Sequence, residues 1–355
     1  MTANRTTPPR PLDVTELFPQ LAPLARTATR LHPCPGSPSP RDSSVGGPLL
    51  WPTDEPWPHC DGPHELDGVN PAVSLADVRL ERRIRTAARG RSMTVQEQET
   101  LARIRPPRTY PRQSSPNPHV CDGPIAMLPL AQLYVRDVPD LRAPAGTDLL
   151  QLLWCPFDHP PVTFMPRTAL FWRSSAAVTD LLTAPPEPPA VQFDLYVPEP
   201  CLLAPEQITE YPNPLELSEE LREPLGDWST WQAADAGVDS SYEVCPEEFY
   251  LDNLAVAPGW KVGGWASWGY TDPIPQHCPA CDTKMAPLLT IPTFEWDNSN
   301  SSWIPHEMRA AAAVLASAGD PRPDQPTAVQ IGSGHQQQLY VCPMSPEHPH
   351  TELMQ

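Results

Sequence analysis

Four residues in the C-terminal third of the chain have the types and spacing of a metal site. Cys278 and Cys281 form a Cys-x-x-Cys pair, the spacing at which two thiolates bind one Zn²⁺. Cys342 and His348 lie further along and could complete a tetrahedral set, with His350 as the alternative imidazole. We therefore predict a structural zinc site at Cys278, Cys281, Cys342 and His348, with about one zinc ion per chain.

Two other interpretations of these thiols stay open at the sequence level. The chain has nine cysteines, an odd number that cannot all be paired within one chain, and they could be free buried thiols. A Cys-x-x-Cys can also be a redox pair, which needs a thiol of low pKa, typically at a helix N-terminus. Here the pair precedes a β-prone segment, which argues against redox chemistry.

A weaker set of candidate ligands lies in the N-terminal half. Cys60, Cys121, Cys155 and His159 are the positions that correspond to the C-terminal ligands if the two halves are aligned. No Cys-x-x-Cys is present there, and Cys60 and Cys121 are separated by a long insertion. We expect this half to have kept the fold and lost the metal.

The alignment of the two halves depends on features that recur in the same order. Val45–Trp51 matches Val262–Trp268 without a gap and includes a Gly-Gly pair in both. Each half then has a Cys-Asp pair, a Met followed by an apolar segment, and a strand that ends in Cys-Pro, at Cys155-Pro156 and Cys342-Pro343. Ordered agreement of this kind predicts an internal duplication.

The chain resembles the YwqG-like family, bacterial proteins with a domain of unknown function. The resemblance lies in the Val-Gly-Gly-x-x-x-Trp turn, in the Cys-x-x-Cys followed by Met and a Leu-rich strand, and in the late strand Gln338–Pro343. It covers roughly residues 40 to 350. It implies a cytoplasmic α+β protein with duplicated β-rich halves, and it implies no particular reaction.

The expected fold class is α+β, with two pseudo-symmetric β-rich halves and helical insertions. We divide the chain into four parts: an N-terminal helix and Pro-rich lead (1–40), a first half with a helical insertion at 64–120 (41–184), a linker with a short strand and an acidic helix (185–241), and a second half with the Cys-x-x-Cys (242–355).

Helices are expected at a few places. In the insertion, Ser74–Arg89 and Thr94–Arg105 read as helices, the second with a capping box at Thr94 and Glu97. In the lead, a helix over about Pro23 to Leu31 is favoured over one that begins at Asp13, because the prolines after Phe18 would interrupt the latter.

The net charge of the chain limits the classes of partner that it can bind. The formal net charge is −19 and the chain has 24 basic residues, which argues against nucleic-acid binding. No apolar run approaches the length of a membrane span, and the N-terminus lacks a signal-peptide core, so we expect a cytoplasmic protein. Acid-rich segments at 198–223 and 235–248 suggest a basic protein partner, although plain solubility explains the same charge.

No enzymatic motif stands out. The sequence has no Gly-x-Ser-x-Gly, no P-loop, no His-Glu-x-x-His and no complete dinucleotide-binding fingerprint. The leading hypothesis is therefore a binding or interaction protein with a structural zinc site. The alternative is an enzyme whose site lies in the cleft between the two halves, since ligand pockets favour such interfaces.

Overall fold

Two six-stranded antiparallel sheets form the body of the protein in a computed structural model, which describes residues 5–66, 72–105, 119–120, 123–159, 162–233, 237–315 and 322–355. The first sheet has the order β14 (Glu206–Glu210), β1 (Arg26–Arg30), β15 (Lys261–Gly263), β16 (Ala286–Pro292), β17 (Gln336–Val341) and β18 (Thr351–Met354). The second has the order β2 (Cys34–Pro35), β13 (Cys201–Leu202), β3 (Ser44–Val45), β9 (Leu128–Tyr134), β10 (Leu149–His159) and β11 (Val162–Arg173). The fold is therefore mixed α+β, as expected.

Each sheet has an interior strand that comes from outside the half that supplies most of its strands. β1 lies between β14 and β15, so the N-terminal lead supplies an interior strand of the sheet built mainly by the C-terminal half. In the same way β13 lies between β2 and β3, in the sheet built by the N-terminal half. We call this arrangement the strand exchange. The lead and the linker are thus parts of the two sheets as well as connections.

The central strands of the two sheets share a detailed register. In one sheet Pro129 of β9 pairs with Leu153, and the ladder then skips one residue of β9 before it resumes. In the other, Pro287 of β16 pairs with Tyr340, and the ladder again skips one residue. Such a bulge adds one residue to one strand and bends it.

A single hydrophobic core joins the sheets. It includes Leu152 and Trp154 of β10 together with Val262 of β15, Leu289 of β16 and Leu339 of β17, all buried. Smaller clusters of buried apolar side chains surround it. Two of these contain cysteines: one holds Trp51, Trp57, Cys60, Met127 and Cys155, and the other holds Trp268, Cys278, Met285, Tyr340 and Cys342.

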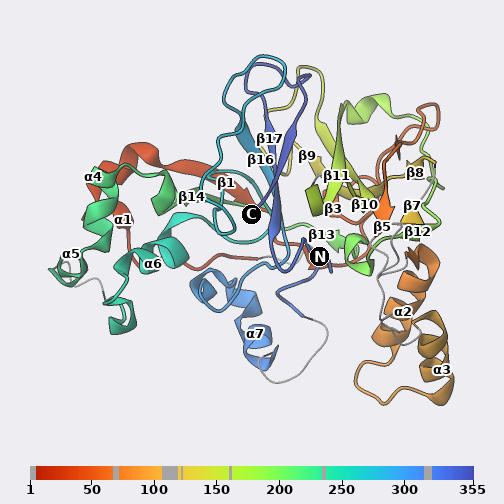
Figure 1. Cartoon of the computed structure of the whole chain (residues 1–355), viewed down its shortest axis with the longest axis horizontal. Coiled ribbons are helices and arrows are strands. Elements are labelled where there is room, and N and C mark those ends of the chain that lie inside the picture. The colour runs from red at the N-terminus through yellow and green to blue at the C-terminus, as the bar shows by residue number, and fades with distance from the viewer. Residues whose placement is uncertain are drawn as a thin grey trace.

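The helices lie at the two ends of the molecule (Figure 1). α2 (Leu75–Ala87) and α3 (Val95–Ile104) project from one end. The other end carries α1 (Val14–Leu17), α4 (Glu219–Arg222), α5 (Trp228–Ala233) and α6 (Pro246–Tyr250), with a π-helical turn at Leu251–Ala255. α7 (Arg309–Leu315) lies between these groups in the view.

The insertion has paired ends and the expected helices. β5 (Glu65–Leu66) pairs with β7 (His119–Val120), β4 (His59–Cys60) pairs with β8 (Ile125–Ala126), and β6 (Val73–Ser74) pairs with β12 (Ala190–Val191). The predicted capping box is present: the Thr94 hydroxyl accepts the Glu97 N–H and the Glu97 carboxylate accepts the Thr94 N–H.

The helix predicted over about Pro23 to Leu31 is wrong. Residues Arg26–Arg30 form β1, preceded by a 3₁₀ turn at Pro19–Leu24. The alternative start at Asp13 is the correct one, because its side chain caps α1 by accepting the Thr15 N–H. No helix among the described residues is long and apolar enough to cross a membrane.

Candidate metal centres

The C-terminal cluster brings together all four predicted ligands. The ligand atoms of Cys278, Cys281, Cys342 and His348 all lie within 4.8 Å of one another. His348 Nδ1 is 3.4 Å from the sulfurs of Cys278 and Cys342, and the Cys281 and Cys342 sulfurs are 3.5 Å apart. His350 is not part of the cluster, because its Nε2 lies 2.9 Å from the Thr168 hydroxyl.

These distances are those of a four-coordinate zinc site. With sulfur about 2.3 Å and nitrogen about 2.0 Å from a tetrahedral ion, ligand atoms lie about 3.5 to 3.8 Å apart. A disulfide would bring two sulfurs to about 2.0 Å, so Cys281 and Cys342, at 3.5 Å, are not bonded. The arrangement could therefore hold one metal ion.

A tight turn positions the two cysteines of the Cys-x-x-Cys. Cys278 N–H donates to the Thr283 carbonyl, and the Cys278 carbonyl accepts from the backbone N–H groups of Cys281 and Asp282. Asp282 takes a positive φ of 57° to close the turn. The pair thus lies in a loop and not at a helix start, so the helix N-terminus that typically lowers the thiol pKa of a redox pair is missing at this position.

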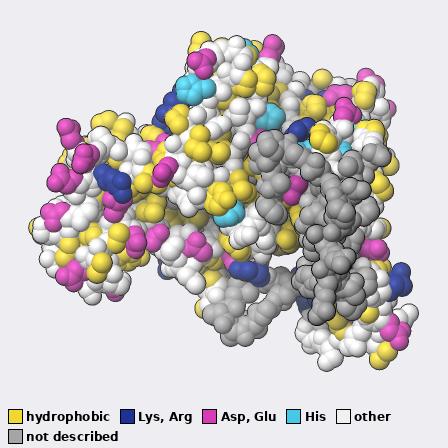
Figure 2. All heavy atoms as spheres, viewed as in Figure 1, with side chains coloured by type: hydrophobic (Ala, Val, Ile, Leu, Met, Phe, Trp, Pro, Cys, Tyr) yellow, Lys and Arg dark blue, Asp and Glu magenta, His cyan; other side chains and the backbone are white. Residues whose placement is uncertain are grey.

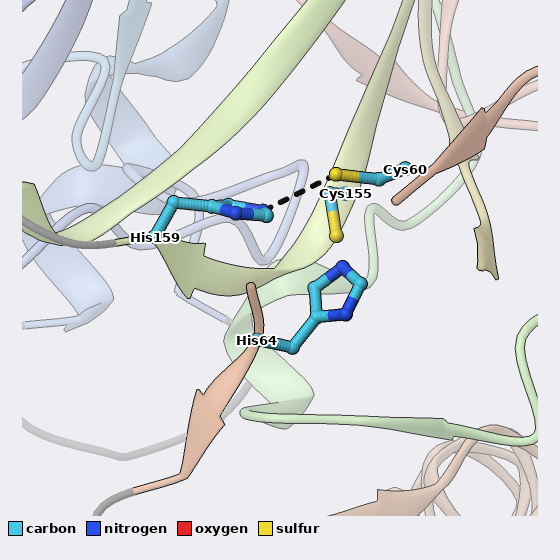
Figure 3. A group of neighbouring side chains, drawn as sticks. All are labelled: Cys60, His64, Cys155 and His159. Atoms are coloured by element: carbon cyan, nitrogen blue, oxygen red, sulfur yellow. Dashed lines mark hydrogen bonds between the residues drawn. The ribbon is translucent and has the colours of Figure 1, made fainter. Parts of the chain in front are cut away.

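A second cluster lies in the N-terminal half, contrary to our expectation. Cys60, His64, Cys155 and His159 are all buried, and their ligand atoms also lie within 4.8 Å of one another. Cys60 Sγ is 3.6 Å from His159 Nε2. Figure 3 shows the two imidazole rings pointing toward the two sulfurs. Cys121, the residue expected in place of His64, lies outside the described residues.

His64 reaches the cluster through a glycine turn. Cys60 ends β4, and Gly62 follows with a φ of +88°. A Cβ at Gly62 would lie 3.1 Å from the His64 backbone nitrogen and 3.2 Å from its Nδ1. Because only glycine combines this φ with so close an approach, Gly62 allows the chain to fold back and place His64 beside Cys155.

Cys155 and His159 lie on one strand and converge because that strand is irregular. Residues four apart on a regular strand are separated by about 13 Å. The pairing of β10 with β11 shifts register between Trp154 and Asp158 and again before His159. Asp158 fixes the end of the strand: its carboxylate accepts the Tyr196 hydroxyl at 2.6 Å, and its N–H donates to Gln192 Oε1 at 2.6 Å.

The chemistry of the N-terminal cluster fits a metal ion. Among the described residues, His64 Nε2 is buried without a hydrogen-bond partner, which is costly for a polar atom unless something binds it. Hydrogen bonding, first from Cys155 and then from His159, lowers the pKa of Cys60 to about 3. A thiolate is the form of cysteine that ligates metals. The site thus offers two sulfurs and two imidazoles to one ion.

The two clusters occupy matching places in their sheets. The Met127 N–H donates to the Pro58 carbonyl, two residues before Cys60, and the Met285 N–H donates to the Gln276 carbonyl, two residues before Cys278. On the neighbouring strands, Cys155 follows Trp154 and Cys342 follows Val341. Trp154 pairs with β9 and Val341 pairs with β16, and each is the last residue before its cysteine to do so.

A spacing signal for the N-terminal cluster is present in the sequence. Cys60 and His64 are separated by three residues, as are Cys155 and His159. Each Cys-x₃-His pair provides two ligands, as a Cys-x-x-Cys does, so the two pairs together provide four. Our alignment missed His64 because it matched Cys121-Asp122 to Cys281-Asp282 and treated residue 64 as the start of an insertion.

The chain matches no model of a known protein family, and comparison with curated protein sequences also gave no match.

Proposed function

We propose that the protein is a zinc protein with two structural sites, one at each Cys/His cluster. The observation that carries the proposal is that each cluster offers four convergent ligand atoms within 4.8 Å. Structural zinc sites have four protein ligands, whereas catalytic sites keep one position open for water or substrate. With four ligands at each cluster, the two ions would stabilise the fold and would not perform chemistry.

Metal content tests this proposal directly. Purified protein should contain about two zinc ions per chain, C60S/C155S about one, and C281S/C342S about one. Cys245 is exposed and belongs to neither cluster, so C245S should keep both ions and serves as the matched control. Wild-type protein without zinc after purification from zinc-supplemented medium would refute the proposal.

We also propose that the two sheets arose by internal duplication and that the chain is a YwqG-like protein. The equivalent bulges, the matched cysteine positions and the two exchanged strands support this origin. An experimental structure of a YwqG-like protein tests it: the same strand order and the same exchange should be present. A YwqG-like structure in which the two sheets have different strand orders would count against it. The cytoplasmic location stays a prediction.

A third proposal concerns a partner. The end of the molecule that carries α4, α5 and α6 has many exposed carboxylates, and Figure 2 shows Asp and Glu side chains gathered there. Over residues 206–257 the only basic side chain is Arg222, which is paired with Glu247. The exposed acidic residues are Glu219, Glu220, Glu223, Asp227, Asp239, Glu243 and Glu248. We define these seven as the acidic lobe, and its charge favours binding to a basic protein.

A salt-dependent pull-down tests the acidic lobe. Exposed charges attract over roughly 8 Å at physiological ionic strength and less at higher salt. A basic partner should therefore bind at low salt, elute at high salt, and be lost from E219Q/E220Q/E223Q. If the variant retains the same proteins as the wild type, the lobe contributes solubility only.

A further inference from the structure

A cavity of about 1040 Å³ lies beside α2, between the two halves of the chain. Its wall combines α2 with the segment after β1, with residues around Asp194–Pro200, and with parts of the C-terminal half that include Glu295, Trp296 and Met308. Neither metal cluster contributes a residue to it. Volumes of 300–1,000 Å³ are typical of small-molecule sites.

The cavity is basic in a protein that is strongly acidic. Five arginines line it, against three carboxylates, although the chain as a whole has a net charge of −19. The arginines are Arg5, Arg82, Arg85, Arg89 and Arg322, and the carboxylates are Asp194, Glu199 and Glu295. We call this space the arginine cavity. Local charge opposite to the net charge indicates a place that attracts anions.

Part of this positive charge is uncompensated. Three of the five arginines are paired: Arg82 with Glu199 at 3.2 Å, Arg85 with Glu81 at 2.8 Å, and Arg322 with Asp324 at 2.7 Å. Arg5 and Arg89, in contrast, make no ion pair with any described residue. Burial raises the pKa of Glu295 to about 7, so this carboxyl is only partly ionised near neutral pH and cancels less of the positive charge.

The basic wall continues into a neighbouring cavity. A second space, of about 630 Å³, is lined by Arg79, Arg82 and Arg83 and by the Gly46-Gly47 turn. The two cavities share Arg82, Thr86, Glu199 and Pro200. Along α2, residues 79, 82 and 86 are spaced three or four apart and therefore lie on one face of the helix, and Arg89 follows in the turn after the helix.

Most of the rest of the wall is apolar. Trp296, Met308 and several prolines lie between the charged groups, as in sites where an apolar surface holds the body of a ligand and a few polar groups fix its orientation. Arginine suits carboxylates and phosphates because its planar guanidinium can donate two parallel hydrogen bonds. An extended polyanion would meet the negative charge of the remaining surface, which favours a ligand that fits within the cavity.

From these features we propose that the arginine cavity binds a small organic anion with phosphate or carboxylate groups. This inference goes beyond the structural zinc sites, since it needs only the fold that they stabilise. It also assigns a ligand class to the space between the halves. Arg85 and Arg89 provide charge at the exposed rim, Arg82 joins the two cavities, and Trp296 and Met308 contact the apolar part of the ligand.

Calorimetric titration of zinc-loaded, full-length protein tests the proposal with two probes, pyrophosphate and citrate. At least one should bind with an affinity that falls as salt is added. R85A/R89A should weaken this binding by roughly tenfold or more, as expected for the loss of charged hydrogen bonds. Both residues are exposed, so the variant should fold, which its zinc content and circular dichroism would verify.

R103A is the matched control, because Arg103 is exposed on the neighbouring α3 and lines neither cavity. It should bind the probes within about twofold of the wild type, the range expected for a distant surface change. Binding of pyrophosphate alone assigns a phosphate ligand, and binding of citrate alone a carboxylate ligand. The proposal is overturned if neither probe binds, or if R103A and R85A/R89A weaken binding equally. Loss of zinc without loss of anion binding would separate the two proposals.

Discussion

The two clusters differ in the charge that they would give to a bound zinc ion. Two thiolates and two neutral imidazoles make the N-terminal site neutral, whereas three thiolates give the C-terminal site a charge of −1. A neutral complex costs less to bury than a charged one. The burial of the two clusters agrees with this difference in charge. All four residues of the N-terminal cluster are buried, whereas in the C-terminal cluster Cys281 is exposed and His348 is half-buried.

This difference predicts unequal release of the two ions. Thr283 hydrogen bonds lower the pKa of the exposed Cys281 to about 6, and thiolates react faster than thiols. Treatment with N-ethylmaleimide should release one zinc per chain quickly and the second only as the protein unfolds, measured with a chromogenic chelator. C281S/C342S should lack the fast phase. Release of both ions in one phase would contradict the assignment.

Glu295 gives the protein a defined pH dependence. Its pKa is raised from 4.5 to about 7 by burial, partly offset by Arg30 and by the Trp260 N–H. Between about pH 4.5 and 7, Glu295 is therefore protonated in the folded state and ionised in the unfolded chain. Stability should fall as the pH rises through this window, by about 3 kcal/mol in total.

Urea unfolding of E295Q at pH 5 and pH 8 checks this expectation. Relative to wild type, the variant should be more stable at pH 8 than at pH 5, because glutamine cannot ionise and still accepts the Trp260 N–H. E99Q, on the exposed face of α3, controls for the loss of one carboxylate. Parallel pH profiles for wild type and E295Q would show that the Glu295 carboxyl is not perturbed.

Spacing in the sequence was sufficient for one cluster and insufficient for the other. Cys278, Cys281, Cys342 and His348 were predicted to converge because a Cys-x-x-Cys has the spacing of two zinc ligands and Cys342 and His348 follow a later strand that could pair beside it. His64 was missed because the alignment of the halves put Cys121 in its place, and the Cys-x₃-His spacing alone does not encode the backward turn at Gly62 or the bend of β10 that bring the two pairs together.

Among the elements, the short strands were the hardest to predict. β1 has the sequence Arg-Thr-Ala-Thr-Arg, in which the two threonines favour a strand. The spacing of Leu24, Ala28 and Leu31 nevertheless suggested a helix. The segment forms a strand because it lies between β14 and β15, where both of its edges form backbone hydrogen bonds. The helices α2 and α3, and the part of β10 that leads into Cys155-Pro156, were predicted because their patterns extend over many residues.

A buried ion pair joins two strands across β1. Lys261 of β15 donates to both oxygens of Glu210 of β14, at 2.7 and 2.8 Å, and the two side chains are 1% and 0% exposed. The Glu210 carboxylate also accepts the Ala257 and Trp265 N–H groups. A Cβ at Gly264 would lie 2.2 Å from a Glu210 oxygen, so glycine makes room for the pair.

Breaking this pair should destabilise the first sheet strongly. K261M leaves a buried carboxylate without its cation, and the free energy of unfolding should fall by about 3–5 kcal/mol. K261M/E210Q should be less destabilised than the sum of the two single variants, as measured by urea unfolding. Additive effects would mean that the two charges are not coupled.

At the scale of the whole molecule, the strand exchange makes the two halves interdependent. Each sheet has an interior strand that comes from the lead or from the linker, and one core spans both sheets. This arrangement could not be predicted from the sequence, because β2, β3 and β13 are two residues long and carry no periodic pattern. The division into two halves with a lead and a linker stays a prediction, and in the structure the lead and the linker each supply an interior strand to a sheet.

The strand exchange also delays the pairing of β1 while the chain is synthesised on the ribosome. β1 is made early, at residues Arg26–Arg30, but its neighbours β14 and β15 follow only at Glu206–Glu210 and Lys261–Gly263. At translation rates of roughly 5–20 residues per second, the strand waits on the order of 10 to 50 seconds for a partner. Throughout that interval its Arg-Thr-Ala-Thr-Arg sequence, polar and charged at both ends, protects a nascent edge from pairing with the wrong chain.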